Sequence, residues 1–584
     1  MVLIYEMKVL SLEVLKSISS MTYTRKEHEK FLDEELNAIS NNYISLIQKE
    51  AIALMDMGEV FVGLFLKIDE SGTAILKLRN SRGLPRKGDY FCATLLVNEM
   101  SKFVNWGNIS WANLRRNYQK EFSEVYCSWL GKSDHPDFSL VGIKGVSLDL
   151  AQELKQNCIL VLGPQEPPIS YYQNLIFLIR TEGKDTEVGK MLDFTYQQNQ
   201  WDPVKLSARE STGDFFRGQL AIDDHIIVQG PPGTGKTYKM AELISTLPKD
   251  SSILVTALTN RALMEIAGKD SIKDMLADGK VYKTSLTSDE SKELPKLNGV
   301  IGRDIHCVPG ALTLSTFYSA SYWAKNTDDL PPFDYVIMDE ASQAFYAMIC
   351  AAKKLGKKVI WIGDQCQMPP IINLNTDRII EKNWGLLASG FKTLCESFPL
   401  PSFMLNDTYR LTQRACAFTN AFYNGNLTSV SENQKGIPID NLHPHGGPSL
   451  LKMRLPSGDR TPNIMLEQVL SIVGQLLKYN KSLEIAVLSK FRATVKIMQQ
   501  AFISKFGENN NVLIDTVERV QGLTCDVCIF CIPNDMTHMS LEKTFFNVAT
   551  SRARYNTIII CDENTLSTPN ANEEVKRYLV ALLK

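Results

Sequence analysis

The sequence lacks several features that define large classes of protein. No apolar run approaches the roughly 18 residues that a membrane-spanning helix needs, so no membrane partner is expected. The formal net charge is only −2 over 584 residues, which excludes the overall basic field of a protein that binds nucleic acid indiscriminately. Any nucleic-acid surface must therefore be a local groove. No internal repeat or low-complexity segment is recognisable, so a repeat architecture is not predicted.

The cysteines follow no zinc-binding or disulfide pattern. The twelve are scattered apart from one cluster of three, and charged residues interrupt Met1–Leu15, where a secretory segment would need an apolar run. This favours a reducing, intracellular compartment, cytoplasmic or, in a eukaryote, nuclear. Cys525, Cys528 and Cys531 stand close together, but they lie in an apolar run of strand type and lack a second ligand pair. They are predicted to be core thiols, and no zinc is expected.

A glycine-rich turn organises the rest of the chain. The apolar run Ile226–Val228 precedes it, and the helix-compatible segment Tyr238–Leu243 follows it. The turn consists of Gly230, Pro231, Pro232, Gly233, Thr234, Gly235, Lys236 and Thr237. Glycines let backbone N–H groups wrap phosphates, and the following helix aims its positive end at them. The turn therefore predicts an ATP site in which Lys236 reaches the β- and γ-phosphates and Thr237 is a ligand of Mg²⁺.

Two acidic residues, Asp339 and Glu340, end a hydrophobic strand further along the chain. In a doubly wound sheet the carboxyl ends of the strands share one crevice, so Asp339 is expected to meet the same Mg²⁺ as Thr237. Glu340 is expected to position and activate the attacking water. An Asp-Glu pair alone is more often part of a turn, but the upstream loop favours the catalytic interpretation. The next strand ends at Gly363–Gln367, and Gln367 is expected within reach of the γ-phosphate.

Two arginines complete the predicted site. Arg410 follows Thr408-Tyr409, and Arg552 lies within Asn547–Arg554. Arginines from a separate lobe stabilise charge on the transferring phosphoryl group when the cleft closes, which couples hydrolysis to lobe motion. Each arginine alone is more often part of a surface ion pair, whereas the complete set favours catalysis.

The residues before about position 205 are organised differently. Apolar residues recur at spacings near three and four from Thr24 to Met57, which predicts one long amphipathic helix. Short strand-like runs separated by turn residues follow and predict a small β-barrel. Arg115 and Arg116 stand near Trp106 and Trp111, a combination that suits a single-strand surface. A solvated charged face is the commoner explanation of such a cluster by itself.

From residue 205 onward, apolar runs of parallel-strand type alternate with helix-compatible segments, as an α/β domain requires. Eight different short segments occur here in the order typical of one family. They are Gly230–Thr237, Leu258–Ala262, Leu314–Phe317, Asp339–Gln343, Gly363–Gln367, Tyr409-Arg410, Thr516–Gly522 and Asn547–Arg554. On these segments the chain resembles superfamily 1 helicases, within them the up-frameshift-like group that includes the nonsense-mediated-decay helicase and the immunoglobulin mu-binding helicase.

The resemblance implies two RecA-like lobes, ATP hydrolysis between them, and 5′→3′ movement along a single strand of DNA or RNA. Residues expected to hold the phosphates of that strand are Thr259, Asn260, Ser315 and Thr316 in the first lobe and Thr516 in the second. Tyr409 is expected to pack on the adenine, and Gly522 to lie at the nucleotide. In this group a helical stalk that carries a small barrel precedes the first lobe.

The predicted fold class is therefore α/β, with two RecA-like doubly wound parallel-sheet lobes preceded by a helical stalk and a small β-barrel. The expected domains are an N-terminal segment with the stalk helix (1–58), the barrel (59–165), a return stalk or linker (166–204), the ATP-binding lobe (205–396) and the second lobe (397–584).

The sequence departs from the family pattern at two places. Gly213 stands where an adenine-reading glutamine is expected, which leaves the base selectivity for ATP open. The family's Gln-Gly-Arg-Glu is replaced by Gln521-Gly522-Leu523-Thr524, so a nucleotide-contacting carboxylate is missing while the catalytic set is intact.

Three functions of different classes follow. The first is a nucleic-acid-stimulated ATPase that moves along one strand and unwinds duplex. The second is a nucleoprotein remodeller or switch that uses ATP with little strand separation. The third, a small-molecule phosphotransferase, is disfavoured because a second α/β lobe brings its own arginines. No nuclease motif stands in the chain, so any cutting would need a protein partner such as a nuclease.

Overall fold

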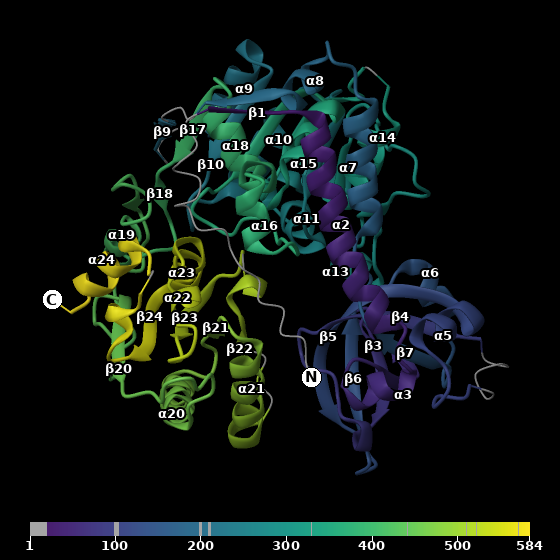
Figure 1. The fold of residues 1–584 in the computed structure, drawn as a ribbon, viewed down its shortest axis with the longest axis vertical. Helices are drawn as coiled ribbons and strands as arrows, with labels where there is room; N and C mark the ends of the chain where they lie inside the picture. Colours follow the sequence, from purple (N-terminus) through teal and green to yellow (C-terminus); the bar gives the residue numbers. More distant parts are fainter. Residues whose placement is uncertain are drawn as a thin grey trace. The chain divides into compact units, whose positions relative to one another are not determined.

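The computed structural model describes residues 20–583 apart from 98–103, 198–200, 208–211, 329, 441, 508, 510, 521 and 570 (Figure 1). The prediction for Met1–Leu15 and the residue Gln521 lie outside this range. The chain divides into two compact units. Unit 1 contains the described parts of Met1–Thr24, Gly183–Leu247 and Tyr335–Lys584, and unit 2 contains Arg25–Glu182 and Pro248–Asp334.

Unit 1 contains a parallel sheet with the strand order β15-β16-β10-β17-β9. The strands are β9 (Val204–Leu206), β10 (His225–Gln229), β15 (Phe333–Met338, in unit 1 from Tyr335 on), β16 (Gly356–Gly363) and β17 (Ser402–Leu405). In the parallel pair β10–β16, Gln229 lies opposite Gly363. The carboxyl ends of β15, β16 and β10 therefore meet at one edge of the sheet, which is where side chains can converge on a ligand.

Short helices connect these strands, and an N-terminal strand is added nearby. The helices are α8 (Glu187–Leu192), α9 (Thr212–Ile222), α10 (Lys236–Thr246), α15 (Tyr346–Leu355), α16 (Thr376–Glu381), α17 (Gly385–Ala388) and α18 (Gly390–Ser397). Strand β1 (Ser20–Tyr23) pairs antiparallel with β8 (Phe194–Gln197). Helix α9 packs against α10, so the segment before the glycine-rich loop lies beside the helix that follows it.

Unit 1 also contains a second parallel sheet, with the order β20-β24-β23-β21-β22. Its strands are β20 (Gly447–Met453), β21 (Ile485–Ser489), β22 (Val512–Thr516), β23 (Cys525–Cys531) and β24 (Ala553–Asp562). The buried strands predicted from apolar runs in both sheets of unit 1 are confirmed. Cys525, Cys528 and Cys531 are at most 2% exposed, so their prediction as core thiols is confirmed as well.

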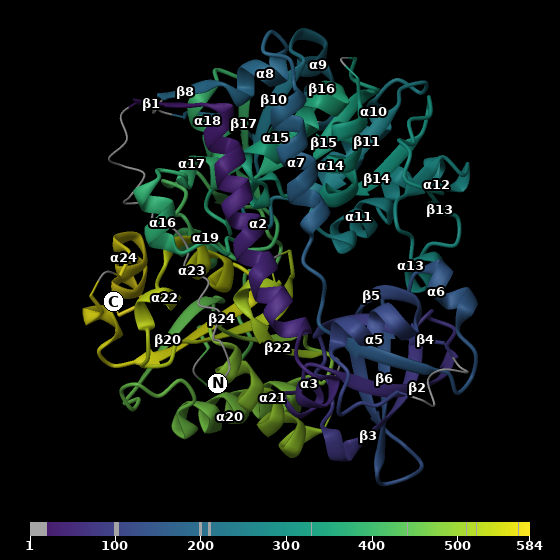
Figure 2. The same ribbon diagram turned by 45° about the vertical axis from the view of Figure 1, so that its right-hand side comes forward.

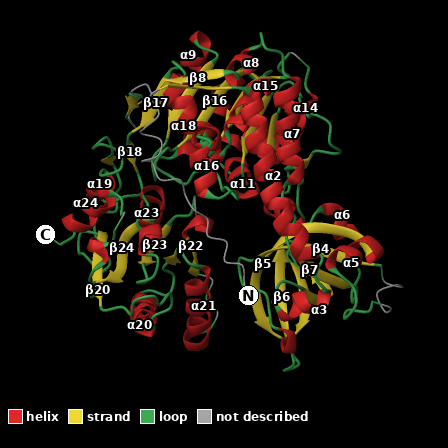
Figure 3. Cartoon of the chain, viewed as in Figure 1, coloured by secondary structure: helices red, strands yellow, loops and turns green. Residues whose placement is uncertain are grey.

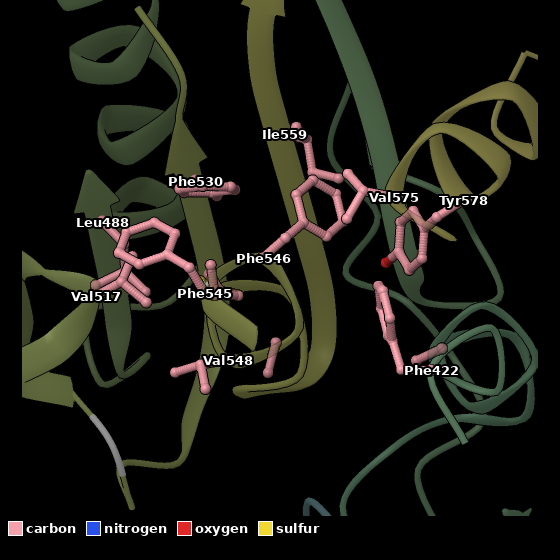
Figure 4. Close-up of a cluster of buried hydrophobic side chains, with 14 of the residues drawn as sticks. Phe422, Leu488, Val517, Phe530, Phe545, Phe546, Val548, Ile559, Val575 and Tyr578 are labelled. Atoms are coloured by element: carbon pink, nitrogen blue, oxygen red, sulfur yellow. Dashed lines mark hydrogen bonds between the residues drawn. The ribbon is translucent and has the colours of Figure 1, made fainter. Parts of the chain in front are cut away.

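Side chains of the second sheet alternate between two hydrophobic cores, as the two-residue period of a strand requires. Cys528 and Phe530 join the first core, and Ile529 and Cys531 join the second. Helices α23 (Lys543–Thr550) and α24 (Glu573–Ala581) fill the first core, and α20 (Asn463–Tyr479) and α21 (Arg492–Phe506) fill the second. Figure 4 shows the first core, where the ring of Phe546 lies 5.9 Å from that of Phe530.

Unit 2 contains the predicted small β-barrel, which is closed in the order β2-β3-β6-β5-β4-β7 (Figure 3). Its strands are β2 (Phe61–Ile68), β3 (Ala74–Arg79), β4 (Tyr90–Leu96), β5 (Gln119–Lys132), β6 (Phe138–Lys144) and β7 (Ile159–Gly163). The sequence did not predict β5, whose buried positions Ser123, Val125 and Cys127 alternate with exposed Glu124 and half-buried Tyr126. Its pairing with both β4 and β6 closes the barrel.

Two predictions for unit 2 are wrong in detail. The single helix expected from Thr24 to Met57 is two helices, α2 (Arg25–Ile47) and α3 (Ala51–Asp56). Glu50 between them is extended and bridges to Ser110, so a tertiary pairing interrupts the helical periodicity. Trp111, expected at a nucleic-acid surface, is fully buried at the start of α5 (Trp111–Tyr118). Its ring fills the space where a Cβ at Gly163 would stand.

The rest of unit 2 contains strands in the order β13-β12-β14-β11 together with several helices. The strands are β11 (Ile253–Ala257), β12 (Val281–Lys283), β13 (Asn298–Gly299) and β14 (Leu312–Thr316). Helix α7 (Ile169–Thr181) packs against both α2 and α14 (Phe317–Asn326), and Figure 2 shows α2 and α7 side by side. Arg180 of α7 donates to Glu29 of α2 at 2.6 Å. Within the described part of the chain, no helix has the length and apolarity needed to cross a membrane.

Candidate nucleotide-binding site

The glycine-rich loop connects β10 to α10 within unit 1, and its glycines are required by its shape. Gly233 and Gly235 have φ angles of +74° and +77°, which residues with a Cβ rarely adopt. A Cβ at Gly233 would also lie 2.4 Å from the Cβ of Arg410, and one at Gly230 would lie 2.2 Å from the Cγ of Lys236. The loop therefore needs glycine here, and it leads into the N-terminal end of α10, where backbone N–H groups bind phosphate.

Polar side chains and carbonyl groups hold the loop in this form. The Nζ of Lys236 donates a hydrogen bond to the carbonyl oxygen of Gly230 at 2.7 Å. The hydroxyl of Thr234 donates to the carbonyl oxygen of Pro231 at 2.9 Å. Thr237, the second residue of α10, is half-buried beside Lys236. Lys236 and Thr237 thus lie at the helix end of the loop, as a phosphate-binding lysine and a metal-binding hydroxyl require.

Asp339 and Glu340 directly follow β15, at the same sheet edge as the loop. Asp339 is 3% exposed, and its Oδ1 accepts a hydrogen bond from the backbone N–H of Glu340 at 2.8 Å. Glu340 has a φ angle of +51°, a left-handed conformation that costs a non-glycine residue about 1–3 kcal/mol and is typical of functional sites.

The residues at this edge fit a magnesium ion bound together with a nucleotide. The described residues contain no group of three or more His, Cys, Asp or Glu side chains arranged to hold a metal. Mg²⁺ does not need such a cage, because one or two protein oxygens and the phosphates of a substrate suffice. The carboxylate of Asp339 and the hydroxyl of Thr237 are ligands of that kind.

Asp364 follows β16 and receives hydrogen bonds from both neighbouring segments. It is 1% exposed, and its Oδ1 accepts from the Nε2 of Gln229, the last residue of β10, at 2.8 Å. Its Oδ2 accepts from the Nε2 of Gln367 at 2.8 Å. Burial raises the pKa of Asp364, while the nearby Lys236 and several donors act in the opposite direction. The carboxylate therefore fixes the amide of Gln367 beside the loop.

Arg552 is a buried cation with an uncommitted donor. Its side chain is 2% exposed, and its Nε donates to the carbonyl oxygen of Val548 at 2.9 Å. Its Nη2 has no hydrogen-bond partner among the residues that the structure describes. Burial lowers the pKa of the guanidinium, whereas the charge of Glu340 raises it. Because a buried donor without a partner is costly, this arrangement favours an anionic ligand.

The other two arginines have different partners. Arg410 donates from Nη1 to the carbonyl oxygen of Ser551 at 3.2 Å and from Nη2 to the hydroxyl of Thr524 at 2.6 Å. Arg554 donates to carboxylates of Glu484 and Asp526 at 2.8 and 2.9 Å. Arg552 and Arg554 share one sequence motif but have different hydrogen-bond partners.

The segment around Tyr409 is bound directly to the loop. The backbone N–H of Tyr409 donates to the carbonyl oxygen of Gly233, and the hydroxyl of Thr408 donates to that of Pro232, both at 2.9 Å. The ring of Tyr409 is 48% exposed and available for stacking. Gly213 lies in α9 against α10, and a Cβ there would be 2.9 Å from the Cγ of Glu242. Gly522 is exposed, with a φ angle of +81°.

The candidates for strand binding in unit 2 lie at the carboxyl ends of two neighbouring strands. Thr259 and Asn260 follow β11 and are exposed, and the hydroxyl of Thr259 caps α11 (Asn260–Ala267). Ser315 and Thr316 end β14, where Thr316 lies opposite Ala257 of β11. Thr316 is half-buried, whereas Ser315 is fully buried and its hydroxyl donates to the carbonyl oxygen of Thr316 at 3.4 Å.

The remaining candidates for strand binding differ in exposure. Thr516 ends β22 in unit 1 and is 7% exposed. Arg115 in unit 2 forms an ion pair with Glu166, and its guanidinium lies 4.9 Å from the ring centre of Phe122. Arg116 is exposed. Arg115 is therefore engaged within the barrel domain, while Arg116 faces solvent.

Sequence reasoning assigned no role to Tyr423 and Asn547, which belong to the same network as Asp364. The hydroxyl of Tyr423 donates to Asp364 Oδ2 at 2.7 Å and accepts from Asn547 Nδ2 at 2.8 Å. Asn547 lies within a segment that the sequence singled out, but Tyr423 stands in an ordinary aromatic-rich stretch. No pattern in the sequence could have connected it to the loop.

The chain is similar to several known proteins. Two profiles described as AAA domain match residues 219–373 and 386–564 and together cover more than half of the chain. The DNA replication ATP-dependent helicase/nuclease of Saccharomyces cerevisiae is 23% identical over 419 residues, covering 64% of this chain and 26% of that protein. The DNA polymerase alpha-associated DNA helicase A of Schizosaccharomyces pombe is 24% identical over 477 residues, covering 68% and 69%.

A third relative comes from the group that the sequence resembles. The regulator of nonsense transcripts 1 homolog of Arabidopsis thaliana is 23% identical over 413 residues, covering 58% of this chain and 31% of that protein. The chain thus spans less than a third of the length of the first and last of these relatives. The two matched regions contain the glycine-rich loop, the acid pair, Gln367 and both arginines. The chain belongs to the up-frameshift-like group of superfamily 1 helicases.

Proposed function

We propose that this protein is an ATP-driven helicase or translocase that moves 5′→3′ along a single strand of DNA or RNA. The observation that carries the proposal is the Nη2 of buried Arg552, which has no hydrogen-bond partner among the described residues and lies in the same unit as a complete phosphate loop and an acid pair. A small-molecule kinase would not require a cation from a second parallel sheet. The two sheets of unit 1 contribute to two RecA-like lobes in this proposal.

ATP binds through the loop in this scheme. Backbone N–H groups of Gly233–Thr237 surround the phosphates, Lys236 approaches the β- and γ-phosphates, and Tyr409 stacks on the base. Thr237 and Asp339 would hold Mg²⁺, which would offset the negative charge of the phosphates. Without a glutamine at position 213, stacking dominates base recognition, so selectivity for adenine over other bases is weak.

The remaining side chains of unit 1 support hydrolysis. Glu340 orients and deprotonates the attacking water, and the amide of Gln367 binds the γ-phosphate. Arg552 and Arg410 stabilise the charge that develops on the phosphoryl group, a contribution worth about 10³–10⁵ in rate in enzymes that use such arginines. Because Arg552 lies two residues after the end of α23, a shift of that helix changes the rate.

The strand is held by polar groups that recognise phosphates and carry no sequence information. Thr259, Asn260, Ser315 and Thr316 in unit 2, with Thr516 in unit 1, are the proposed contacts. The buried Ser315 contributes through its backbone. Arg116 extends the surface onto the barrel, whereas Arg115 contributes only when it exchanges Glu166 for a phosphate.

The domain scheme and the cellular setting complete the proposal. Helices α2 and α7 form the stalk that carries the barrel (59–165), with 1–58 and 166–204 on either side and lobes at 205–396 and 397–584. ATP and nucleic acid are abundant inside cells, which supports an intracellular site of action. A protein partner such as a nuclease would supply any strand cutting.

Steady-state ATP hydrolysis with matched single-stranded DNA and RNA oligonucleotides tests the proposal. We expect strong stimulation by at least one polymer, loss of activity in Glu340→Gln, and full activity in Glu467→Gln, an exposed residue of α20. A duplex with a 5′ tail should be unwound faster than one with a 3′ tail, and the opposite preference would refute the polarity. Stimulated hydrolysis without strand separation would instead favour the nucleoprotein remodeller, and no stimulation by either polymer would remove the motor function.

A further inference from the structure

The carboxylate of Asp364 accepts four hydrogen bonds in the interior of unit 1. Two of them reach Oδ1, from the side chain of Gln229 at 2.8 Å and from the backbone N–H of Cys366 at 3.0 Å. The other two reach Oδ2, from Gln367 at 2.8 Å and from the hydroxyl of Tyr423 at 2.7 Å. A buried carboxylate needs such donors because it has lost its water. The shared carboxylate therefore holds all four donors in fixed positions.

Tyr423 connects this carboxylate to helix α23. Its hydroxyl accepts from the Nδ2 of Asn547, and the same Nδ2 donates to the carbonyl oxygen of Cys366 at 2.7 Å. Tyr423 is 4% exposed and Asn547 is fully buried. Asn547 lies in the middle of α23, which ends directly before Ser551 and Arg552. The network thus extends from the strand before the glycine-rich loop to the helix that precedes the buried Arg552.

The direction of the hydrogen bonds determines what Tyr423 can do. Asn547 donates to the tyrosine oxygen, so the tyrosine hydrogen is available for Asp364. Asp364 Oδ2 shares its lone pairs between Tyr423 and Gln367, and it holds one of the two N–H groups of Gln367. The second N–H of that amide then has a fixed direction, which a γ-phosphate contact requires.

We infer that Tyr423 is a positioning residue, which orients the amide of Gln367 through Asp364 and couples it to α23 through Asn547. The inference rests on the proposed ATPase function and adds a residue that touches neither nucleotide nor metal. Movement of α23 would shift Asn547 and, through Tyr423, reorient the amide of Gln367. Gln367 and Arg552 would then change position together. The movement of α23 would thereby be coupled to ATP hydrolysis through a continuous chain of hydrogen bonds.

The test is a double-mutant cycle in the full chain between Tyr423→Phe and Gln367→Ala, measured as strand-stimulated ATP hydrolysis. Tyr423→Phe removes one hydroxyl without changing the ring, and we expect a roughly tenfold loss of kcat, the effect of one hydrogen bond to a charged group. The KM for ATP should stay within about twofold, since the loop is untouched. In the Gln367→Ala background the same substitution should change kcat by less than about twofold.

Tyr196→Phe is the matched control for a buried hydroxyl. Tyr196, in β8, is 1% exposed, and its hydroxyl also donates to a carboxylate, that of Glu396, at 2.7 Å. This variant is expected to leave kcat unchanged. Thermal unfolding of each variant reports on the fold, and a second cycle between Tyr423→Phe and Asn547→Ala tests the link to α23. Non-additive losses in this second cycle support the link.

The outcomes separate the inference from the function on which it rests. A wild-type chain without strand-stimulated hydrolysis would overturn the proposed function. An active wild-type chain in which the losses of Tyr423→Phe and Gln367→Ala simply multiply would overturn this inference alone. A higher KM with an equally lowered unfolding temperature in both backgrounds would also overturn it, because that pattern indicates a purely structural tyrosine.

Discussion

The ammonium group of Lys236 donates a 2.7 Å hydrogen bond to the carbonyl oxygen of Gly230, the residue at the other end of the same loop. The aliphatic part of the lysine follows the backbone closely, and only a glycine at position 230 leaves room for it. A phosphate would compete with this carbonyl oxygen for the ammonium group. The position of the lysine therefore depends on the absence of a side chain six residues earlier.

Gly230→Ala should reduce ATP hydrolysis although it alters no group that touches the nucleotide. The new Cβ would stand 2.2 Å from the Cγ of Lys236, so the lysine must leave its present path. Loss of one correctly placed donor typically lowers kcat by about 10²–10³. Steady-state ATPase kinetics with thermal unfolding as a check on the fold would measure the effect.

Gly218→Ala is the control for this prediction. Gly218 lies in α9, and a Cβ there would have no heavy atom of the described residues within 4 Å. Alanine in a helix interior is favoured over glycine by roughly 0.5–1 kcal/mol, so this variant should be fully active and slightly more stable. Equal activity of the two variants would show that the position of Lys236 does not depend on Gly230.

Arg552→Gln should lower kcat far more than Arg554→Gln. Arg552 is buried, and its Nη2 has no partner in the part of the chain that the structure describes, whereas Arg554 donates to Glu484 and Asp526. We expect a loss of about 10³ or more for Arg552→Gln, as for other arginines that act on a transferring phosphoryl group, and a change within about threefold for Arg554→Gln. Single-turnover hydrolysis would measure the chemical step directly. Similar losses in both variants would contradict the assignment.

Elements whose signal lies within one short segment of the sequence were predicted, whereas elements defined by pairing with distant segments were not. Strands β10, β15, β16, β21, β23 and β24 were predictable because continuous apolar runs are the signature of strands buried on both faces. The sequence did not predict β9, β17, β20 and β22 of the same two sheets. The barrel was predictable from the change to short runs between turns. Strand β5 escaped notice because a strand with one face in solvent alternates polar and apolar residues, and its pairs with β4 and β6 are distant in sequence.

The candidate site also contains residues that the sequence predicts and residues that only the fold brings together. The loop and the acid pair are contiguous segments whose chemistry follows from residue type and spacing, so the sequence was sufficient to predict them. The pairing of Arg115 with Glu166 and the link from Tyr423 to Asp364 join residues that are far apart along the chain. Only the folded backbone brings them together, and no local pattern encodes them.

Gly163→Ala should destabilise unit 2 through Trp111. Gly163 ends β7, and a Cβ there would lie 2.1 Å from a ring carbon of a tryptophan that is fully buried. Because the ring has no space to move into, overpacking should cost about 1–3 kcal/mol of the free energy of unfolding. Urea unfolding followed by tryptophan fluorescence would measure this cost.

Gly142→Ala provides a contrast within the same barrel. A Cβ at Gly142 would lie 2.2 Å from the Nε1 of Trp129, but this tryptophan is only half-buried. Its ring can swing toward solvent, so we expect a smaller loss of stability than in Gly163→Ala. A loss as large as that of Gly163→Ala would show that burial of the ring does not decide the cost.

His225, the first residue of β10, should make unit 1 less stable as the pH falls. Its ring stacks on Trp361 with 5.9 Å between ring centres, and its Nε2 lacks a hydrogen-bond partner among the described residues. Burial and the positive charges of Lys353 and Lys358 lower the pKa of His225, while Glu187 and Asp224 act to raise it. The net direction is downward from the ordinary value of 6.5.

The sign of the pH dependence follows from this direction. As the pH falls below 6.5, the unfolded chain takes up a proton on this histidine and the folded chain does not, so the free energy of unfolding decreases until the folded pKa is reached. Each unit by which the pKa is lowered corresponds to about 1.4 kcal/mol. Thermal unfolding between pH 7.5 and 5 should therefore show a steeper decrease for the wild-type chain than for His225→Gln. His538→Gln, at an exposed residue of unit 1, should follow the wild-type curve. Parallel curves for wild type and His225→Gln would mean that this histidine titrates alike in the folded and unfolded chain, and that β10 begins with a side chain that water reaches.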